Sequence, residues 1–144
     1  MIVGVPKEIK PQENRVALTP AGAHARAGKG HRVLVQKSAG LGAGFPDEDY
    51  ARAGAELVPE AEPLFRQAGL ILKVKEPLDT EYGLLREGQM LFTYLHIAPN
   101  PGLGRALCQS GVTAIAYETV QPADGTLPLL VPMSEVAGRM AIQV

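Results

Sequence analysis

The stretch GLILKVKEP, residues 69–77, is a short apolar segment that ends in two lysines and stops at a proline. Short apolar segments bounded by glycine or proline and containing β-branched residues are typical of β-strands. Strands buried in a parallel sheet are normally apolar from end to end. Lys73 and Lys75 therefore mark the end of a strand, where a lysine faces water, a partner or a ligand.

Segments of this kind alternate with amphipathic segments along the rest of the chain. Strands are expected at residues 1–5, 31–36, 70–74, 90–95 and 112–117. Helices are expected at residues 20–28, 47–54, 60–69 and 100–111. Thr19 and Asn100 are good N-caps, and each is followed by a proline at the first helical position. The alternation predicts an α/β fold with a doubly wound, mostly parallel sheet and flanking helices.

Composition bears on several function classes. The chain has 144 residues and a net charge of −1, which gives no support for nucleic-acid binding or for a basic membrane surface. The single cysteine, Cys108, excludes an internal disulfide framework and a CxxC metal site, and we expect it to be buried. The sequence contains no signal-peptide pattern and no apolar run of membrane-spanning length. We therefore expect a cytoplasmic protein with no metal, nucleic acid or membrane partner.

The C-terminal segment, residues 132–144, carries apolar residues at helical spacing. They are Met133, Val136, Ala137, Met140, Ala141 and Val144. This stripe predicts an amphipathic helix, but no glycine cap, basic last turn or proline stops it. We therefore expect the chain to be a fragment of a longer protein, with Met133, Val136 and Met140 exposed.

Polar residues follow three of the expected strands at the point where each strand ends. They are Lys75, His96 and Glu118. The carboxyl ends of parallel strands share one edge of the sheet, and ligands bind there in open α/β folds. The loop after the first strand, residues 6–20, brings Arg15 to the same edge.

These side chains suit chemistry on a small carboxylate. Arg15 presents a planar fork that matches a carboxylate, Lys75 could polarise a carbonyl, and His96 is a natural general acid and base. Other interpretations stay open: Lys75 could be solvated, Arg15 could pair with Glu13 at the surface, and His96 could be structural. Glu118 could orient a neighbouring side chain rather than react.

The glycine-rich segment 39–50 does not match a dinucleotide-binding fingerprint. A GxGxxG pattern that begins at Gly40 needs glycine where Phe45 stands, and one that begins at Gly42 needs glycine where Asp47 stands. We expect a flexible loop over a pocket instead.

Five longer motifs resemble the N-terminal part of the alanine dehydrogenases. They are GVPKEIKPQENRVALTP at 4–20, KVKEP at 73–77, LFTYLHIAP at 91–99, AYETV at 116–120 and LPLLVPMSEVAGRMA at 127–141. The resemblance extends along all 144 residues. The related nicotinamide nucleotide transhydrogenase α subunit shares the first motif and a lysine in the second, but lacks the histidine and the PMSEVAGRMA segment. An alanine dehydrogenase is therefore favoured over a transhydrogenase or a non-catalytic module that binds small carboxylates.

The resemblance implies reversible, NAD-dependent oxidative deamination of L-alanine to pyruvate and ammonium. By this resemblance, Arg15 holds the substrate carboxylate, and Lys75 contacts substrate oxygens. His96 is the catalytic acid and base, and Lys75 takes part in catalysis beside it. Tyr94 and Met133 line the pyruvate pocket.

The resemblance also implies a two-domain enzyme. Residues 1–130 match part of a Rossmann-like or flavodoxin-like substrate domain, and residues 131–144 match the start of an interdomain helix. Ser134 is expected to face the cofactor, NAD, whose main site lies on a Rossmann domain that is absent from this chain. The chain alone is therefore expected to be inactive, and the full-length enzyme to be a homo-oligomer, usually a hexamer.

Overall fold

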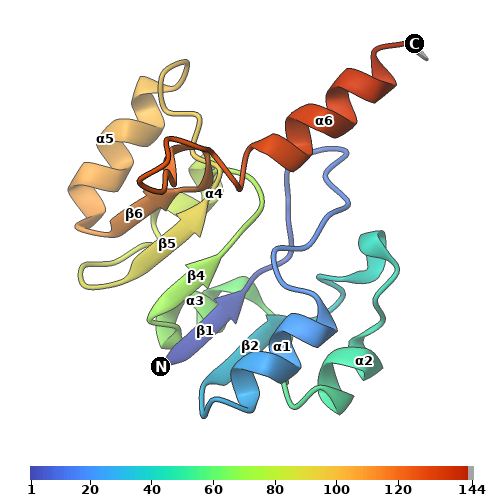
Figure 1. The fold of residues 1–144 in the computed structure, drawn as a ribbon. Coiled ribbons are helices and arrows are strands. Elements are labelled where there is room, and N and C mark those ends of the chain that lie inside the picture. Colours follow the sequence, from blue (N-terminus) through green and yellow to red (C-terminus); the bar gives the residue numbers. More distant parts are fainter. Residues whose placement is uncertain (143–144) are drawn as a thin grey trace.

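A single parallel sheet forms the centre of the molecule in a computed structural model that describes residues 1–142 (Figure 1). Its strands are β1 (Ile2–Val5), β2 (Arg32–Gln36), β3 (Glu56–Val58), β4 (Leu70–Leu72), β5 (Met90–Thr93) and β6 (Thr113–Ala116). Their order in the sheet is β3-β2-β1-β4-β5-β6, and every neighbouring pair is parallel. The predicted α/β fold is confirmed.

Helices connect the strands, and all but the one at residues 79–82 lie in segments predicted to be helical. They are α1 (Pro20–Ala27), α2 (Asp47–Arg52), α3 (Ala61–Gln67), α4 (Asp79–Tyr82), α5 (Pro101–Ser110) and α6 (Val131–Met140), with short 3₁₀ helices η1 (Leu41–Ala43) and η2 (Tyr117–Thr119). The side chain of Thr19 accepts a hydrogen bond from the N–H of Gly22, and that of Asn100 accepts one from the N–H of Leu103. Both expected N-caps are therefore present.

Each face of the sheet has its own apolar core, because side chains alternate between the two faces along a strand. In β2, Val33 and Val35 pack in the core that contains residues of α1 and α2, whereas Leu34 packs in the core that contains residues of α3 and α5. Tyr50 of α2 and Phe65 of α3 are fully buried, one in each core. Coverage on both faces explains why the central strands β1, β2 and β4 have nearly continuous apolar sequences.

The order of the strands reverses beside β1, which pairs with β2 on one side and with β4 on the other. The loops that leave the carboxyl ends of β1 and β4 turn away from each other at such a point and leave a crevice where ligands bind. The loop after β1 contains Arg15, and the loop after β4 contains Lys75. The fold therefore brings these two cations to the same crevice.

Cys108 is exposed, so the prediction that it is buried is wrong. Helix α5 turns Leu103 and Leu107 toward the core, and these residues are one helical turn apart. The residue after Leu107 lies about 100° further around the helix, which directs Cys108 to solvent.

Lys73 has its partner inside the chain. Its side chain is 1% exposed, and its Nζ lies 2.8 Å from Glu81 Oε1 and 3.4 Å from Glu8 Oε2. Glu8 also accepts a hydrogen bond from the N–H of Val74, and Glu81 accepts one from the N–H of Leu78. This buried group ties the loop after β1, the end of β4 and helix α4 together.

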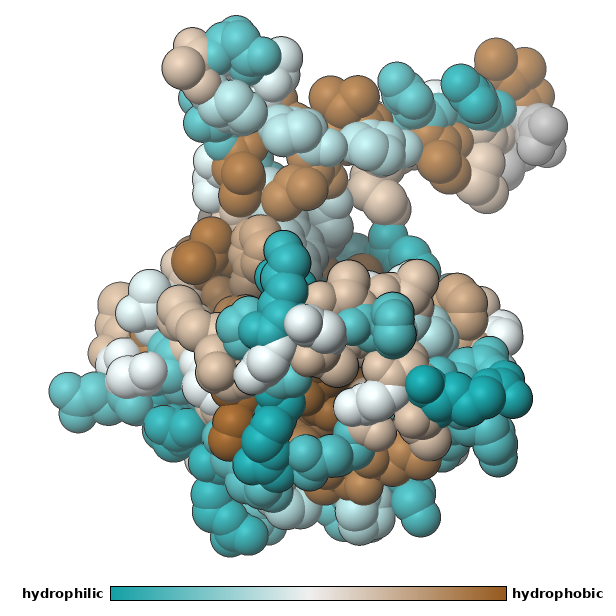
Figure 2. Space-filling model, turned by 60° about the horizontal axis from the view of Figure 1, so that its bottom comes forward, coloured by the Kyte–Doolittle hydropathy of each residue, from teal (hydrophilic) through white to brown (hydrophobic). Residues whose placement is uncertain are grey.

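Helix α6 projects from the body of the molecule (Figure 1) and carries apolar side chains on its surface (Figure 2). Met133 is 38% exposed, and Val136 and Met140 are each 54% exposed, as expected. The predicted helix also included residues 143–144; Val144, the last residue of its apolar stripe, lies outside the described residues.

Candidate functional site

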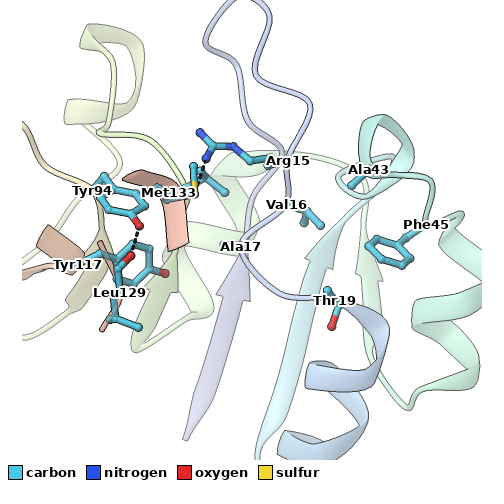
Figure 3. Close-up of a pocket in the computed structure, with 11 residues that line it drawn as sticks. Arg15, Val16, Ala17, Thr19, Ala43, Phe45, Tyr94, Tyr117, Leu129 and Met133 are labelled. Carbon is cyan, nitrogen blue, oxygen red and sulfur yellow. Dashed lines mark hydrogen bonds between the residues drawn. The ribbon is translucent and has the colours of Figure 1, made fainter. Parts of the chain in front are cut away.

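The side chains predicted to bind substrate meet in one cavity of about 270 Å³ at the carboxyl edge of the sheet. The cavity is lined by Arg15, Lys75, Tyr94, His96, Leu130, Met133 and Ala137. A larger cavity of about 370 Å³ shares Arg15, Tyr94 and Met133 with it (Figure 3). Loops after β1, β4 and β5 and the helix α6 thus contribute to a single site.

Glu13 forms a bidentate ion pair with the guanidinium of Arg15. Its carboxylate accepts hydrogen bonds from Arg15 Nε at 2.8 Å and Nη2 at 2.6 Å, and from the backbone N–H of Arg15 at 2.9 Å. These hydrogen bonds lower the pKa of the Glu13 carboxyl and raise the pKa of Arg15. The pairing of Arg15 with Glu13, which the sequence left open, is therefore present.

This ion pair leaves one edge of the Arg15 guanidinium for a ligand. Glu13 occupies the Nε and Nη2 side, while Nη1 points toward Met133 and lies 3.4 Å from its sulfur (Figure 3). A guanidinium has five N–H donors, so donors remain on the Nη1 edge after Glu13 has bound. The side chain of Arg15 is 41% exposed, whereas that of Glu13 is 8% exposed. Glu13 is thus the fixed support and Arg15 the accessible cation.

Buried Thr93 fixes the backbone that carries Lys75. Its hydroxyl, at the end of β5, donates a hydrogen bond to the carbonyl of Lys75 at 2.9 Å. The N–H of Tyr94 donates to the carbonyl of Val74 at 3.2 Å. These bonds extend the pairing of β4 and β5 beyond the regular strands and hold Lys75 next to Tyr94.

His96 has an unusual backbone conformation, with a φ of 45°. Its N–H donates to Glu118 Oε1 at 2.8 Å, and the N–H of Leu95 donates to the same carboxylate at 3.0 and 3.2 Å. The imidazole lies parallel to the ring of Tyr94, with 6.0 Å between the ring centroids and 15° between the planes. Glu118 therefore contacts the backbone of its neighbours, whereas the sequence suggested contact with a side chain.

Aromatic rings form one wall of the site. Tyr117 packs edge-on against Tyr94 at 5.0 Å and against Phe92 at 4.2 Å between centroids. The hydroxyl of Tyr94 donates to the carbonyl of Leu129, which fixes the segment before α6 (Figure 3). Burial raises the pKa of Tyr117 to about 12, so this phenol stays protonated at neutral pH.

A buried carboxylate lies near the candidate cations. Burial raises the pKa of the Glu8 carboxyl, and the charge of Lys73 opposes that rise. Glu8 and Arg15 also line a small polar cavity of about 180 Å³ beside the loop after β1. Glu8 therefore has two roles: it pairs with Lys73, and it lines a cavity next to Arg15.

The side chain predicted to face the cofactor lies on the surface of α6. Ser134 is exposed on α6, next to Met133, and its hydroxyl lies 3.3 Å from the carbonyl of Leu130. In segment 39–50, Gly40 and Gly42 serve close packing, because a Cβ at Gly40 would lie 2.6 Å from the ring of Tyr50 and one at Gly42 would lie 2.8 Å from the backbone oxygen of Asn14. A turn packed in this way is not an open phosphate cradle.

Two further site residues, Thr93 and Tyr117, were missed from the sequence because each lies within an apolar segment and reads as a strand residue. Thr93 is a polar residue at a buried strand position, and that was the available signal. Within residues 1–142 no cluster of histidine, cysteine and acidic residues could hold a metal ion. No helix in this part of the chain has both the length and the apolar character to cross a membrane.

The sequence and the fold match known proteins along the whole chain. The chain is 58% identical to the alanine dehydrogenases of Methanococcus maripaludis and of Bacillus subtilis over all 144 residues. It spans 39% and 38% of the lengths of those relatives. A solved structure of an L-alanine dehydrogenase is 50% identical and superimposes with a TM-score of 0.95, covering 99% of this chain and 39% of that one.

A transhydrogenase is also similar, at greater distance. The structure of a transhydrogenase from Sinorhizobium meliloti is 31% identical and superimposes with a TM-score of 0.78, covering 85% of this chain and 35% of that one. The sequence model of the alanine dehydrogenase/PNT N-terminal domain matches residues 4–137, which is nearly the whole chain. The chain therefore belongs to the alanine dehydrogenase/PNT N-terminal domain family.

Proposed function

We propose that this domain binds the substrate of an NAD-dependent alanine dehydrogenase, which interconverts L-alanine with pyruvate and ammonium. One observation carries the proposal: Arg15, Lys75 and His96, from three separate loops, line the same cavity. The reaction class is supported by relatives that are named alanine dehydrogenase and are 54–58% identical to the chain.

The three side chains have different roles in this proposal. The open edge of Arg15 binds the substrate carboxylate through hydrogen bonds between charged groups, each worth about 1.5–3 kcal/mol. The ammonium of Lys75 binds the carbonyl oxygen of pyruvate and stabilises negative charge that develops on it. His96 acts as general acid and base: it exchanges a proton with the nitrogen or oxygen atom bonded to the reacting carbon. Tyr94 and Met133 enclose the methyl group.

In this proposal, NAD is the oxidant of the reaction. Ser134 contacts it from α6, and the main cofactor site belongs to a separate nucleotide-binding domain. Residues 1–130 then form the substrate domain, and residues 131–144 begin the interdomain helix. We further propose that the complete enzyme is a cytoplasmic homo-oligomer, a hexamer, and that this domain alone is inactive.

Steady-state kinetics of the complete enzyme test the proposal. We expect NADH formation that depends on L-alanine. Arg15→Ala removes the carboxylate partner and should raise KM for alanine by about tenfold or more, which corresponds to about 1.4 kcal/mol of binding. His96→Ala removes the acid and base and should lower kcat by about 10²- to 10⁴-fold. Arg105→Ala, at an exposed position on α5, is the matched control and should leave both constants unchanged.

The transhydrogenase alternative gives a different result in the same assay. Hydride exchange between two nicotinamide nucleotides, without oxidation of alanine, would contradict the proposal and favour the more distant relative.

A further inference from the structure

The backbone at His96 has a conformation that residues with a Cβ rarely adopt. Its φ of 45° lies in the left-handed region, which favours glycine. A residue keeps such a conformation only when its surroundings hold it there, and these residues are frequent at functional sites. Contacts of the neighbouring peptides must therefore fix His96.

Glu118 provides these contacts from the adjacent strand. The paired residues of β5 and β6 end at Thr93 and Ala116, so the N–H groups of Leu95 and His96 lie beyond the regular ladder. The carboxylate of Glu118, in η2 directly after β6, accepts both N–H groups at 2.8–3.2 Å. We call this arrangement, the Glu118 carboxylate with the N–H groups of Leu95 and His96, the carboxylate clamp.

The clamp and the core together determine the direction of the imidazole. The side chain of Leu95 is 3% exposed and packs in the core that contains residues of α5. Its N–H would be left without an acceptor if the carboxylate were lost, and that is unfavourable for a buried donor. The side chain of His96 is exposed, so packing around the ring does little to fix it. The backbone therefore sets the position of the ring at the edge of the substrate cavity.

We propose that Glu118 is a positioning residue for His96. Its carboxylate holds the peptides at residues 95–96 in the left-handed turn that directs the imidazole into the cavity with Arg15 and Lys75. Glu118 acts through the backbone and does not exchange a proton with the substrate. The kinetic consequence of this role rests on the proposed function, in which His96 is the acid and base.

Kinetics of Glu118 variants in the complete enzyme test this role. Glu118→Ala should lower kcat for alanine oxidation by about 10- to 100-fold, the effect of displacing a catalytic group by about 1 Å. KM for alanine should change by less than about threefold, because Glu118 does not contact the carboxylate of the substrate. Glu118→Gln keeps an oxygen acceptor and should retain an intermediate rate. Glu87→Ala, an exposed glutamate just before β5, should match the wild type.

A His96→Ala background separates positioning from a general loss of structure. If Glu118 acts through His96, adding Glu118→Ala to His96→Ala should lower kcat by less than about twofold further. Equal losses in both backgrounds, or a wild-type kcat in Glu118→Ala, overturn the proposal.

Amide NMR of residues 1–144 tests the clamp without any reaction. The Leu95 and His96 amide signals should shift in Glu118→Gln, and their hydrogen exchange should become faster, while the amides of α1 stay unchanged. Unchanged signals and exchange at residues 95–96 overturn the clamp. If the wild-type enzyme does not oxidise alanine, the proposed function fails, whereas the NMR result still shows whether Glu118 holds the backbone.

Discussion

Glu13, Thr93 and Glu118 each support one of the three groups that face the candidate substrate. Glu13 binds the guanidinium of Arg15, and Thr93 and Glu118 bind the backbones that carry Lys75 and His96. A reactive group that is already held in place loses less entropy when substrate binds. At the scale of single residues, the candidate site therefore depends on supporting residues that do not themselves line its cavity.

The Glu13–Arg15 ion pair should make stability depend on pH. Hydrogen bonds from Arg15 lower the pKa of Glu13 in the folded state below its ordinary value of 4.5. The pair therefore stabilises the fold above about pH 4.5, and this contribution is lost as the pH falls through the lower, folded-state pKa. Because Arg15 is partly solvated, we expect Glu13→Gln to cost about 1 kcal/mol or less at pH 7.

Thermal unfolding of residues 1–144 at several pH values checks this prediction. The melting temperature of Glu13→Gln should lie a few degrees below that of the wild type at pH 7, and the difference should shrink under acidic conditions. A difference that is the same at both ends of the pH range would show that the charge of Glu13 does not stabilise the fold.

The segment after β4 shows how one element combines support and function. Lys73 turns inward to Glu8 and Glu81, and Lys75, two residues later, lines the cavity proposed to bind substrate. The inward lysine ties this segment to α4 and to the loop after β1, and so positions the outward one. Segment 69–77 therefore carries two lysines in different environments, one buried in an ion pair and one at a cavity.

Substitution by methionine should destabilise the fold strongly at Lys73 and hardly at all at Lys75. Lys73→Met leaves two buried carboxylates without their cation and should destabilise the fold by about 3–5 kcal/mol. Lys75→Met should change the free energy of unfolding by less than about 0.5 kcal/mol but remove the proposed contact with substrate oxygen. Urea unfolding followed by circular dichroism measures both. Similar losses of stability in the two variants would contradict the separation of roles.

Secondary structure was predictable where an element lay in a segment long enough to show a pattern. The apolar segments at 1–5, 31–36 and 90–95 all became strands. Strand β3 and helix α4 were missed because neither lies in a longer apolar or amphipathic segment, whereas the equally short β4 lies in the apolar segment 70–74. The environment of Cys108 was predicted wrongly because a free cysteine is most often buried, whereas the buried face of α5 is formed by Leu103 and Leu107.

The contacts of the site were less predictable than its members. Strand ends indicated that Arg15, Lys75 and His96 would share one edge, and they share a cavity. The partners of Lys73 were hidden because Glu8 is 65 positions away in the sequence. The target of Glu118 was hidden because it is a backbone group, which side-chain patterns do not report.

At the scale of the whole molecule, the topology explains why three distant motifs form one site. All strands run in one direction, and the order of the strands reverses beside β1. The loops that carry Arg15, Lys75 and His96 therefore converge at one edge, and α6 adds Met133 from the C-terminal segment. Helix α6 itself projects from the body (Figure 1), and its apolar side chains Val136 and Met140 are exposed.

Titration of pyruvate into residues 1–144, followed by ¹H–¹⁵N NMR, tests most directly whether this edge binds a small carboxylate. We predict chemical-shift changes centred on Arg15, Lys75, Tyr94 and His96, their loss in Arg15→Ala, and their retention in the control Arg105→Ala. No response in a folded wild-type domain, or a response that persists in Arg15→Ala, would contradict the assignment of this cavity as the carboxylate site.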